Sequence, residues 1–177
     1  LQDDDTLAAL NIFMLTLEYN DEDKIENVGK TYAQEINWIV LNESRNNFIR
    51  NLAIDAKGNT LVLFQFVEKH GKVLYDIISE KAEENRKVFY VSGQTEATDR
   101  EAIRKIVETQ ENSIIVASLG TFSTGINIKN LHNIVFASPS KSQIRVLQSI
   151  GRSLRKSDDG RVSKLYDLVD DLQHKSR

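Results

Sequence analysis

The chain has 177 residues with 40% hydrophobic and 28% charged side chains, a composition typical of folded globular proteins that excludes an intrinsically disordered one. It has no cysteine and its three histidines are far apart, so disulfides, a thiolate nucleophile and a metal site are not expected. No apolar run approaches the ~18 residues of a membrane span, and no signal peptide opens the chain. We therefore expect an intracellular protein that contacts no membrane.

The net charge of −3 is unevenly distributed along the chain. Residues 1–50 hold four Lys and Arg against ten Asp and Glu, whereas residues 140–177 hold nine against five. An acidic protein is not a general nucleic-acid binder, but a basic C-terminal segment is suited to face phosphates.

Residues 1–9 are acidic and do not begin with methionine, so we expect them to be a linker from a missing N-terminal domain. Residues 10–177 are enough for one domain with a substantial core. Residues 10–19 are rich in Ile, Phe, Leu and Thr and predict a strand. Residues 20–27 are expected to be a charged loop.

The tripeptide Gly29-Lys30-Thr31 invites comparison with a phosphate-binding loop. That pattern needs another glycine five positions before Gly29, where this chain has Lys24. The acidic residues around it would also repel phosphate. We therefore expect an ordinary loop followed by a helix cap.

Residues 32–54 have apolar side chains at helical spacing, which predicts one broken helix or two, with Trp38 in the core. From Gly58 onward, strands and helices alternate. The expected strands are residues 60–66, 87–91, 113–118, 133–138 and 162–169. The expected helices are residues 67–82, with Val73, Leu74, Ile77 and Ile78 inward, and residues 98–109, capped by Thr98 and Glu101 and buried through Ala102, Ile103, Ile106 and Val107.

This alternation predicts an α/β fold, because strands joined by helical crossovers form a parallel sheet with helices on both faces. Such sheets place their ligands at the carboxyl ends of the strands. Functional residues are therefore expected in the segments that directly follow each strand.

Residues 140–155 predict an amphipathic helix that begins in a capping box. Gln148, Arg152 and Arg155 share one face beside the apolar stripe. A guanidinium group suits phosphate oxygens because it is planar, always charged and bidentate. Taken alone, however, such a helix is more commonly an ordinary one with a solvated basic face.

The order of four segments resembles the C-terminal RecA-like domain of superfamily 2 helicases over roughly residues 58–170. A strand ending Phe64-Gln65 corresponds to motif IV, and one ending Ser92-Gly93 to motif IVa. The Gly-, Ser- and Thr-rich residues 118–128 correspond to motif V, although such residues are common in loops. The sequence Gln-x-x-Gly-Arg-x-x-Arg at residues 148–155 corresponds to motif VI.

Two segments that precede these motifs indicate which branch of the superfamily the chain resembles most. Tyr32-x-x-Glu35 and Arg45-Asn46 are most similar to phage UvsW-type DNA helicases and to their XPB-like and restriction-motor relatives.

The resemblance implies roles for residues in these motifs. Arg155 and Arg152 would be catalytic, reaching the γ-phosphate of ATP bound on another domain, a contribution worth roughly 10³–10⁵ in rate. Gln148, Gly125 and Asn127 would contact the nucleotide, although Asn127 stands where the family commonly has an acid. The nucleic-acid backbone would be contacted by Gln65, Ser92, Gly93, Ser118, Thr121, Ser123 and Thr124.

Neither a Walker A loop nor an Asp-Glu-x-His/Asp motif occurs in the 177 residues. The resemblance thus implies a P-loop NTPase-type fold that lacks the P-loop itself. The chain would be inactive alone, because ATP and Mg²⁺ would be bound mainly by a missing N-terminal RecA-like domain. The expected function is the second motor domain of an ATP-dependent DNA helicase that acts on single-stranded or branched DNA in recombination or repair. If the gene is phage-encoded, it would act in the cytoplasm of a bacterial host.

Two alternatives remain from the sequence. An RNA helicase of the same superfamily shares all four motifs. A non-catalytic α/β binding or assembly module would instead use Arg152 and Arg155 in structural ion pairs with Asp167, Asp170 or Asp171.

Overall fold

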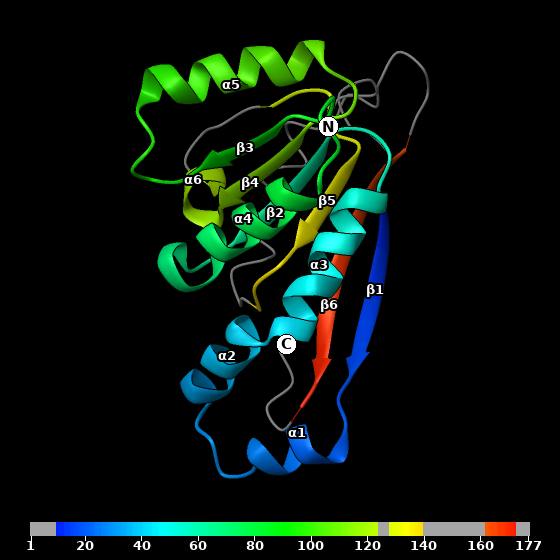
Figure 1. The fold of residues 1–177 in the computed structure, drawn as a ribbon, viewed down its shortest axis with the longest axis vertical. Helices are drawn as coiled ribbons and strands as arrows, with labels where there is room; N and C mark the ends of the chain where they lie inside the picture. The colour runs from blue at the N-terminus through cyan, green and yellow to red at the C-terminus, as the bar shows by residue number, and fades with distance from the viewer. Residues whose placement is uncertain (1–9, 124–127, 140–161, 173–177) are drawn as a thin grey trace, which may run out of the picture.

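The structure is a computed structural model that describes residues 10–123, 128–139 and 162–172 (Figure 1). Its elements are, in chain order, β1 (Leu10–Glu18), α1 (Asp21–Glu26), α2 (Tyr32–Leu41), α3 (Glu43–Asp55), β2 (Thr60–Phe64), the π-helical turn η1 (Val67–Gly71), α4 (Lys72–Lys81), β3 (Val88–Val91), α5 (Ala97–Thr109), β4 (Ile114–Ser118), α6 (Leu119–Ser123), β5 (Asn133–Phe136) and β6 (Ser163–Asp171). Among the described helices, none is long and apolar enough to cross a membrane.

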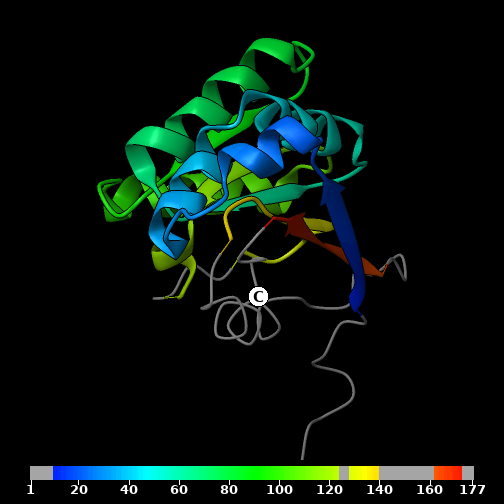
Figure 2. The same ribbon diagram turned by 90° about the horizontal axis from the view of Figure 1, so that it is seen from below.

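The strands of the described residues form one six-stranded sheet in the order β1-β6-β5-β2-β4-β3. Each pairing between them is parallel. β2 lies in the interior, where Val62 is level with Val116 of β4 and Val135 of β5. β1 forms one margin of the molecule (Figure 2) and pairs along its full length with β6. The predicted α/β class with a mostly parallel sheet is confirmed.

Helices cover both faces of this sheet, as alternation along β2 shows. Leu61 and Leu63 belong to a core that includes Val107 of α5 and Phe122 of α6. Val62 points to the opposite face and belongs to a core shared with α3 and α4. The residues of β2 and β4 are all buried, which explains why these strands have uninterrupted apolar sequences.

A third, smaller core lies at the carboxyl edge of the sheet, beneath α2. Ile36, Ile39 and Val40 of α2 pack there with Leu172, which directly follows β6. Tyr19 and Phe66, which come just after β1 and β2, complete it. The helix α2 is therefore packed against residues that come just after three strands, β1, β2 and β6.

The segment before β2 differs from the expectation in two places, residues 20–27 and Trp38. Residues 20–27 are a helix and not a loop, because the Asn20 side chain caps α1 by accepting from the Asp23 amide at 2.8 Å. The prediction of a broken helix or two helices over residues 32–54 is confirmed: α2 and α3 are separated at Asn42, which has an extended backbone and whose side chain caps α3. Trp38 is only partly buried, and its indole lines a surface groove. The cap expected after Gly29 is confirmed as a capping box of Thr31 and Gln34.

The helices after β2 also require corrections. β2 ends at Phe64, and the helix that follows starts with a π turn in which the Gly71 amide donates to the Phe66 carbonyl at 2.8 Å. Val73 is 38% exposed and not inward, whereas Leu74 and Ile78 are buried as expected.

The expected cap of the next helix is wrong, and part of its predicted core face is exposed. α5 begins at Ala97 after Glu96, without a side-chain cap, so Thr98 lies inside the first turn. Glu101 pairs with Arg104 on the outer face instead. Ala102 is exposed, which leaves Val107 as the fully buried contact of α5 with the core. The expected loop at residues 118–128 starts with the short helix α6.

Candidate functional site

Four strand ends lie side by side at the carboxyl edge of the sheet. Phe64 of β2 is level with Ser118 of β4, Val91 of β3 with Ala117, and Leu63 of β2 with Phe136 of β5. The segments expected to carry function therefore emerge from adjacent strands along one edge, as parallel pairing requires.

Gln65, the first residue after β2, has an exposed side chain and an engaged backbone. Its amide donates to Ser138 Oγ at 3.1 Å, which ties the end of β2 to the end of β5. The side chain is therefore presented to solvent from a fixed position.

Ser92 and Gly93 form a tight turn after β3. The Ser92 amide donates to Thr95 Oγ1 at 3.0 Å, and Ser92 Oγ accepts from the Gln94 amide at 3.3 Å. The Ser92 side chain is buried, whereas Gly93 is exposed and a Cβ there would meet nothing within 4 Å. The turn thus uses its serine in internal hydrogen bonds and leaves its glycine backbone accessible to solvent.

Ser118 and Thr121 are buried and contact each other. Their hydroxyl oxygens lie 2.5 Å apart, and the Thr121 amide donates to Ser118 Oγ at 3.4 Å. This is the contact of a helix cap, so Ser118 starts α6 directly from the last residue of β4. The expected contact of Ser118 and Thr121 with nucleic acid remains a prediction. Ser123, another predicted contact, is the last residue of α6.

The remaining predicted site residues lie outside the described residues. These are Thr124, Gly125, Asn127, Gln148, Arg152 and Arg155.

A chain of buried hydrogen bonds lies directly behind the carboxyl edge and was not anticipated. His70 Nε2 lies 3.0 Å from Asn46 Oδ1, and its Nδ1 lies 2.7 Å from Ser138 Oγ. Because Asn46 Nδ2 donates to the Val40 carbonyl at 3.0 Å, its oxygen faces the ring and must accept from Nε2–H. Nδ1 then accepts from the Ser138 hydroxyl, which itself accepts from Gln65. This assigns His70 as the neutral Nε2–H tautomer.

Burial, with the Arg45 guanidinium as a second cause, lowers the pKa of His70 to about 3. The histidine is therefore neutral at physiological pH and holds α3, η1 and the end of β5 together. The imidazole therefore has a structural role and does not act as a general acid at physiological pH.

A buried ion pair lies beside this chain of hydrogen bonds. Arg45 of α3 contacts Asp170 of β6 through Nε–Oδ1 at 2.8 Å and Nη2–Oδ2 at 3.1 Å. Its Nη1 donates to the Ala137 carbonyl at 2.5 Å, and the Tyr19 hydroxyl donates to Asp170 Oδ1 at 2.5 Å. Burial, followed by the charge of Asp170, raises the pKa of Tyr19, so this hydroxyl remains a donor.

The two buried clusters contact neighbouring residues at the end of β5: Arg45 bonds to the Ala137 carbonyl and His70 to the Ser138 hydroxyl. The sequence pointed to Arg45 and Asn46 only through a resemblance, and it suggested Arg152 or Arg155 as partners of Asp170. In the structure, Asp170 instead accepts hydrogen bonds from Arg45 and Tyr19. Separately, burial and the nearby Asp170 raise the pKa of Asp167.

Comparisons with known proteins agree with this arrangement. The family model described as the helicase conserved C-terminal domain matches residues 44–157. The ATP-dependent DNA helicase uvsW of Enterobacteria phage T4 is 40% identical over 173 residues, which cover 96% of this chain and 34% of that protein. The chain thus spans about a third of the length of this curated relative.

Solved structures show the same fold. The crystal structure of T4 UvsW matches with a TM-score of 0.78 and 39% identity, over 92% of this chain and 33% of that one. The SWI2/SNF2 ATPase core domain of Sulfolobus solfataricus matches with a TM-score of 0.60 and 15% identity, over 91% of this chain and 40% of that one. The second match supports the fold alone.

Proposed function

Because this chain belongs to the helicase conserved C-terminal domain family, we propose that it is the second motor domain of an ATP-dependent DNA helicase or translocase. The observation that carries the proposal is the alignment of the three strand ends that bear motifs IV, IVa and V along one edge of the sheet, beside β5, the strand that precedes motif VI in the chain. In this role the chain completes an active site whose ATP and Mg²⁺ are bound mainly by an N-terminal RecA-like domain.

Arg155 would be the arginine finger, with Arg152 beside it and Gln148, Gly125 and Asn127 near the nucleotide. A guanidinium group placed at the γ-phosphate stabilises the charge that develops there during phosphoryl transfer. Gln148, Arg152 and Arg155 come after Ser138 in the chain, and Ser138 is bonded to His70.

Nucleic acid would run along the same edge. Gln65 and Gly93 are exposed there and are available to sugar and phosphate groups, whose contacts carry no sequence information. The hydroxyls of Ser118 and Thr121 contact each other, so we assign them to starting α6 at the end of β4. The side chains of Ser123 and Thr124 would then contact the backbone.

The choice of DNA follows the T4 relative, which is a DNA helicase. Branched DNA in recombination or repair rests on the resemblance to UvsW-type helicases. The non-catalytic alternative is weakened at one point, because Asp170 is already bonded to Arg45 and Tyr19 and is not needed by Arg152 or Arg155.

The test is the ATPase activity of this chain joined to an N-terminal RecA-like domain of a close relative. Forked or duplex DNA should stimulate turnover more than RNA of equal length, and the 177-residue chain alone should show negligible turnover. Equal or greater stimulation by RNA would favour the RNA helicase alternative. Robust turnover by the chain alone would contradict the assignment as half of a motor.

A further inference from the structure

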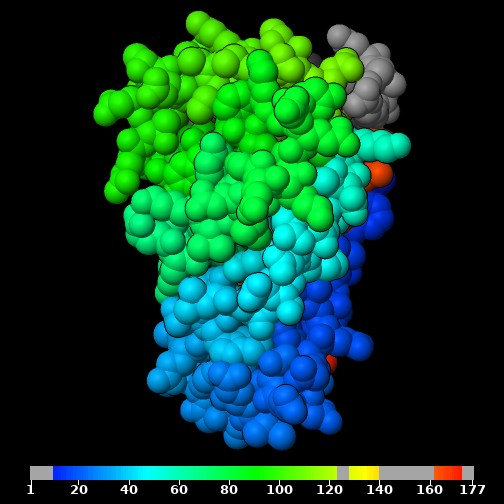
Figure 3. Space-filling view, viewed as in Figure 1, coloured from blue at the N-terminus to red at the C-terminus, as the bar shows by residue number. Residues whose placement is uncertain are grey.

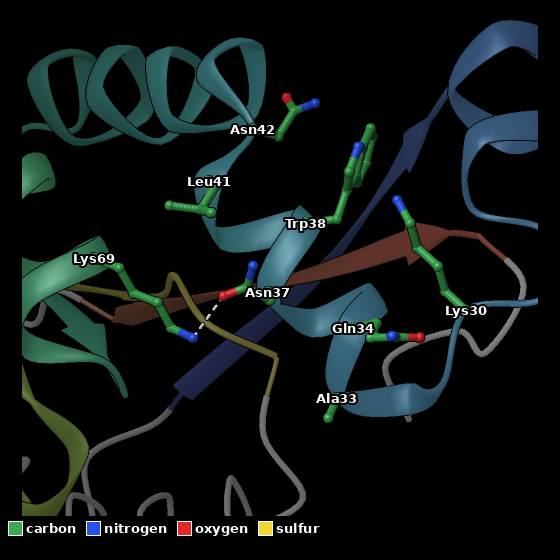
Figure 4. A pocket seen from close by; sticks show the side chains of 8 residues that line it. All are labelled: Lys30, Ala33, Gln34, Asn37, Trp38, Leu41, Asn42 and Lys69. Carbon is green, nitrogen blue, oxygen red and sulfur yellow. Dashed lines mark hydrogen bonds between the residues drawn. The ribbon is translucent and has the colours of Figure 1, made fainter.

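A groove of about 620 Å³ runs along the outer face of α2 (Figure 4). Its charged, amide and aromatic lining residues are Lys30, Gln34, Asn37, Trp38, Asn42 and Lys69. Two of its eight lining residues are lysines and none is a carboxylate. The lining is thus rich in amides and carries two lysines, of which Lys30 pairs with Glu26 just outside the groove.

The side chains of the groove are held in place by contacts beneath it. Trp38 is half-buried and meets the Tyr19 ring edge-on, with centroids 5.4 Å apart, so its indole is fixed before any ligand binds. Lys30 Nζ lies 5.6 Å from the Trp38 ring centroid and 3.7 Å from Glu26 Oε1. At the other end, Lys69 Nζ lies 2.7 Å from Asn37 Oδ1.

The groove adjoins the carboxyl edge described above. Lys69 is four residues after Gln65, and its ammonium group lies 4.2 Å from the ring centroid of Phe66, the residue next to Gln65. The space-filling view shows that the region of α1 and α2 forms the lower end of the molecule, below the helices that follow β2 (Figure 3). A strand that passes Gln65 would therefore reach Lys69 first and Trp38 next.

We propose that this groove binds single-stranded nucleic acid, with one base stacked on Trp38 and phosphates at Lys30 and Lys69. This inference rests on the proposed function and extends it to a second contact surface. Aromatic faces with neighbouring cations are how proteins hold single strands without reading their sequence. The amides of Gln34, Asn37 and Asn42 supply donors and acceptors for sugar and base edges.

The chemistry favours a nucleic acid over an acidic peptide. A peptide carboxylate would use the two lysines but leave the fixed indole face without a matching planar group. The net charge of residues 1–50 is negative, so binding depends on these two local cations and on stacking. The binding constant should therefore depend only weakly on salt concentration. Each single-strand phosphate contact adds ~0.7 to the steepness of log K against log [salt], so removal of both lysines should reduce that steepness by about 1.4.

Trp38 makes the test direct because it is the only tryptophan in the chain. Titration of the 177-residue chain with unlabelled oligo(dT) should quench its fluorescence, and poly-glutamate should not. In anisotropy titrations with labelled oligo(dT), Trp38→Leu should weaken binding about fivefold to 150-fold, the range for one stacked base. Trp38→Phe should restore part of that loss. Lys30→Ala with Lys69→Ala should weaken binding and reduce the salt slope as stated.

The matched control is Lys72→Ala with Lys81→Ala, which removes the same charge from α4 and should leave affinity unchanged. No quenching by oligo(dT), equal quenching by poly-glutamate, or equal losses in the control and groove variants would overturn the inference. Circular dichroism of each variant excludes misfolding as the cause.

A second measurement separates this inference from the proposed function. In the protein joined to its N-terminal RecA-like domain, Trp38→Leu should raise the DNA concentration that gives half-maximal ATPase stimulation several-fold. If DNA stimulates the ATPase but Trp38→Leu leaves the half-maximal DNA concentration unchanged, the proposed binding at the groove is wrong and the motor assignment stands. If DNA does not stimulate the unsubstituted protein at all, the motor assignment is wrong.

Discussion

Substitution of Arg45 by methionine should destabilise the chain severely, because it leaves a carboxylate buried without its cation. Asp170 is 0% exposed and would keep only the Tyr19 hydroxyl of the contacts described above, while the Ala137 carbonyl would lose its donor. Removal of one partner from a buried ion pair costs about 3–5 kcal/mol. This is a large part of the ~5–15 kcal/mol by which domains are stable.

The assay is urea unfolding of the 177-residue chain, followed by circular dichroism. Arg104→Met is the matched control, because Arg104 pairs with Glu101 and Glu108 on the solvent side of α5 and exposed pairs contribute little. Addition of Asp170→Asn to Arg45→Met should recover part of the loss, because the orphaned group is then uncharged. A loss for Arg45→Met no larger than that for Arg104→Met would refute the reasoning.

Two further predictions concern the residues around η1. Because the folded-state pKa of His70 is about 3 against 6.5 when unfolded, the unfolded chain binds the extra proton between these values and stability falls as pH falls below 6.5. We expect a loss of about 2 kcal/mol between pH 7 and 5 from this group, which His70→Gln should remove from the pH profile of unfolding; an unchanged slope would contradict it. Gly71→Ala should cost ~1–3 kcal/mol, because its Cβ would overlap the Phe64 ring, whereas Gly120→Ala, with nothing within 4 Å, should be nearly neutral. Similar unfolding midpoints for the two alanine variants would show that the Phe64 contact relaxes freely.

The sheet could be predicted from the sequence because its signal is local. β2 and β4 are buried on both faces, so their sequences are uninterrupted apolar runs of the right length. The alternation with helices then predicts parallel pairing, and parallel pairing predicts which segments share an edge.

Helix starts were harder to predict because they depend on single side chains. Asn20 begins α1 through one hydrogen bond to the Asp23 amide, and the surrounding charged residues otherwise resemble a loop. For α5 the error had the opposite cause, since Glu101 fits a capping pattern in sequence but pairs with Arg104 in space.

The buried polar clusters could not be predicted from local pattern. Arg45 and Asp170 are separated by 125 positions, and His70 and Ser138 by 68. Polar and charged residues normally face solvent, so no local pattern indicates that these four are buried. Their pairing follows only from the packing of α3 and η1 against the ends of β5 and β6.

Single-turnover ATP hydrolysis most directly tests the proposal that Arg155 completes the active site of another domain. In the protein joined to its N-terminal RecA-like domain, at saturating DNA and ATP, Arg155→Ala should lower the rate of hydrolysis by roughly 10³–10⁵, with ATP affinity changed far less. Arg104→Ala, on the outer face of α5, should leave both unchanged. A rate for Arg155→Ala within a few-fold of the unsubstituted protein would contradict the account.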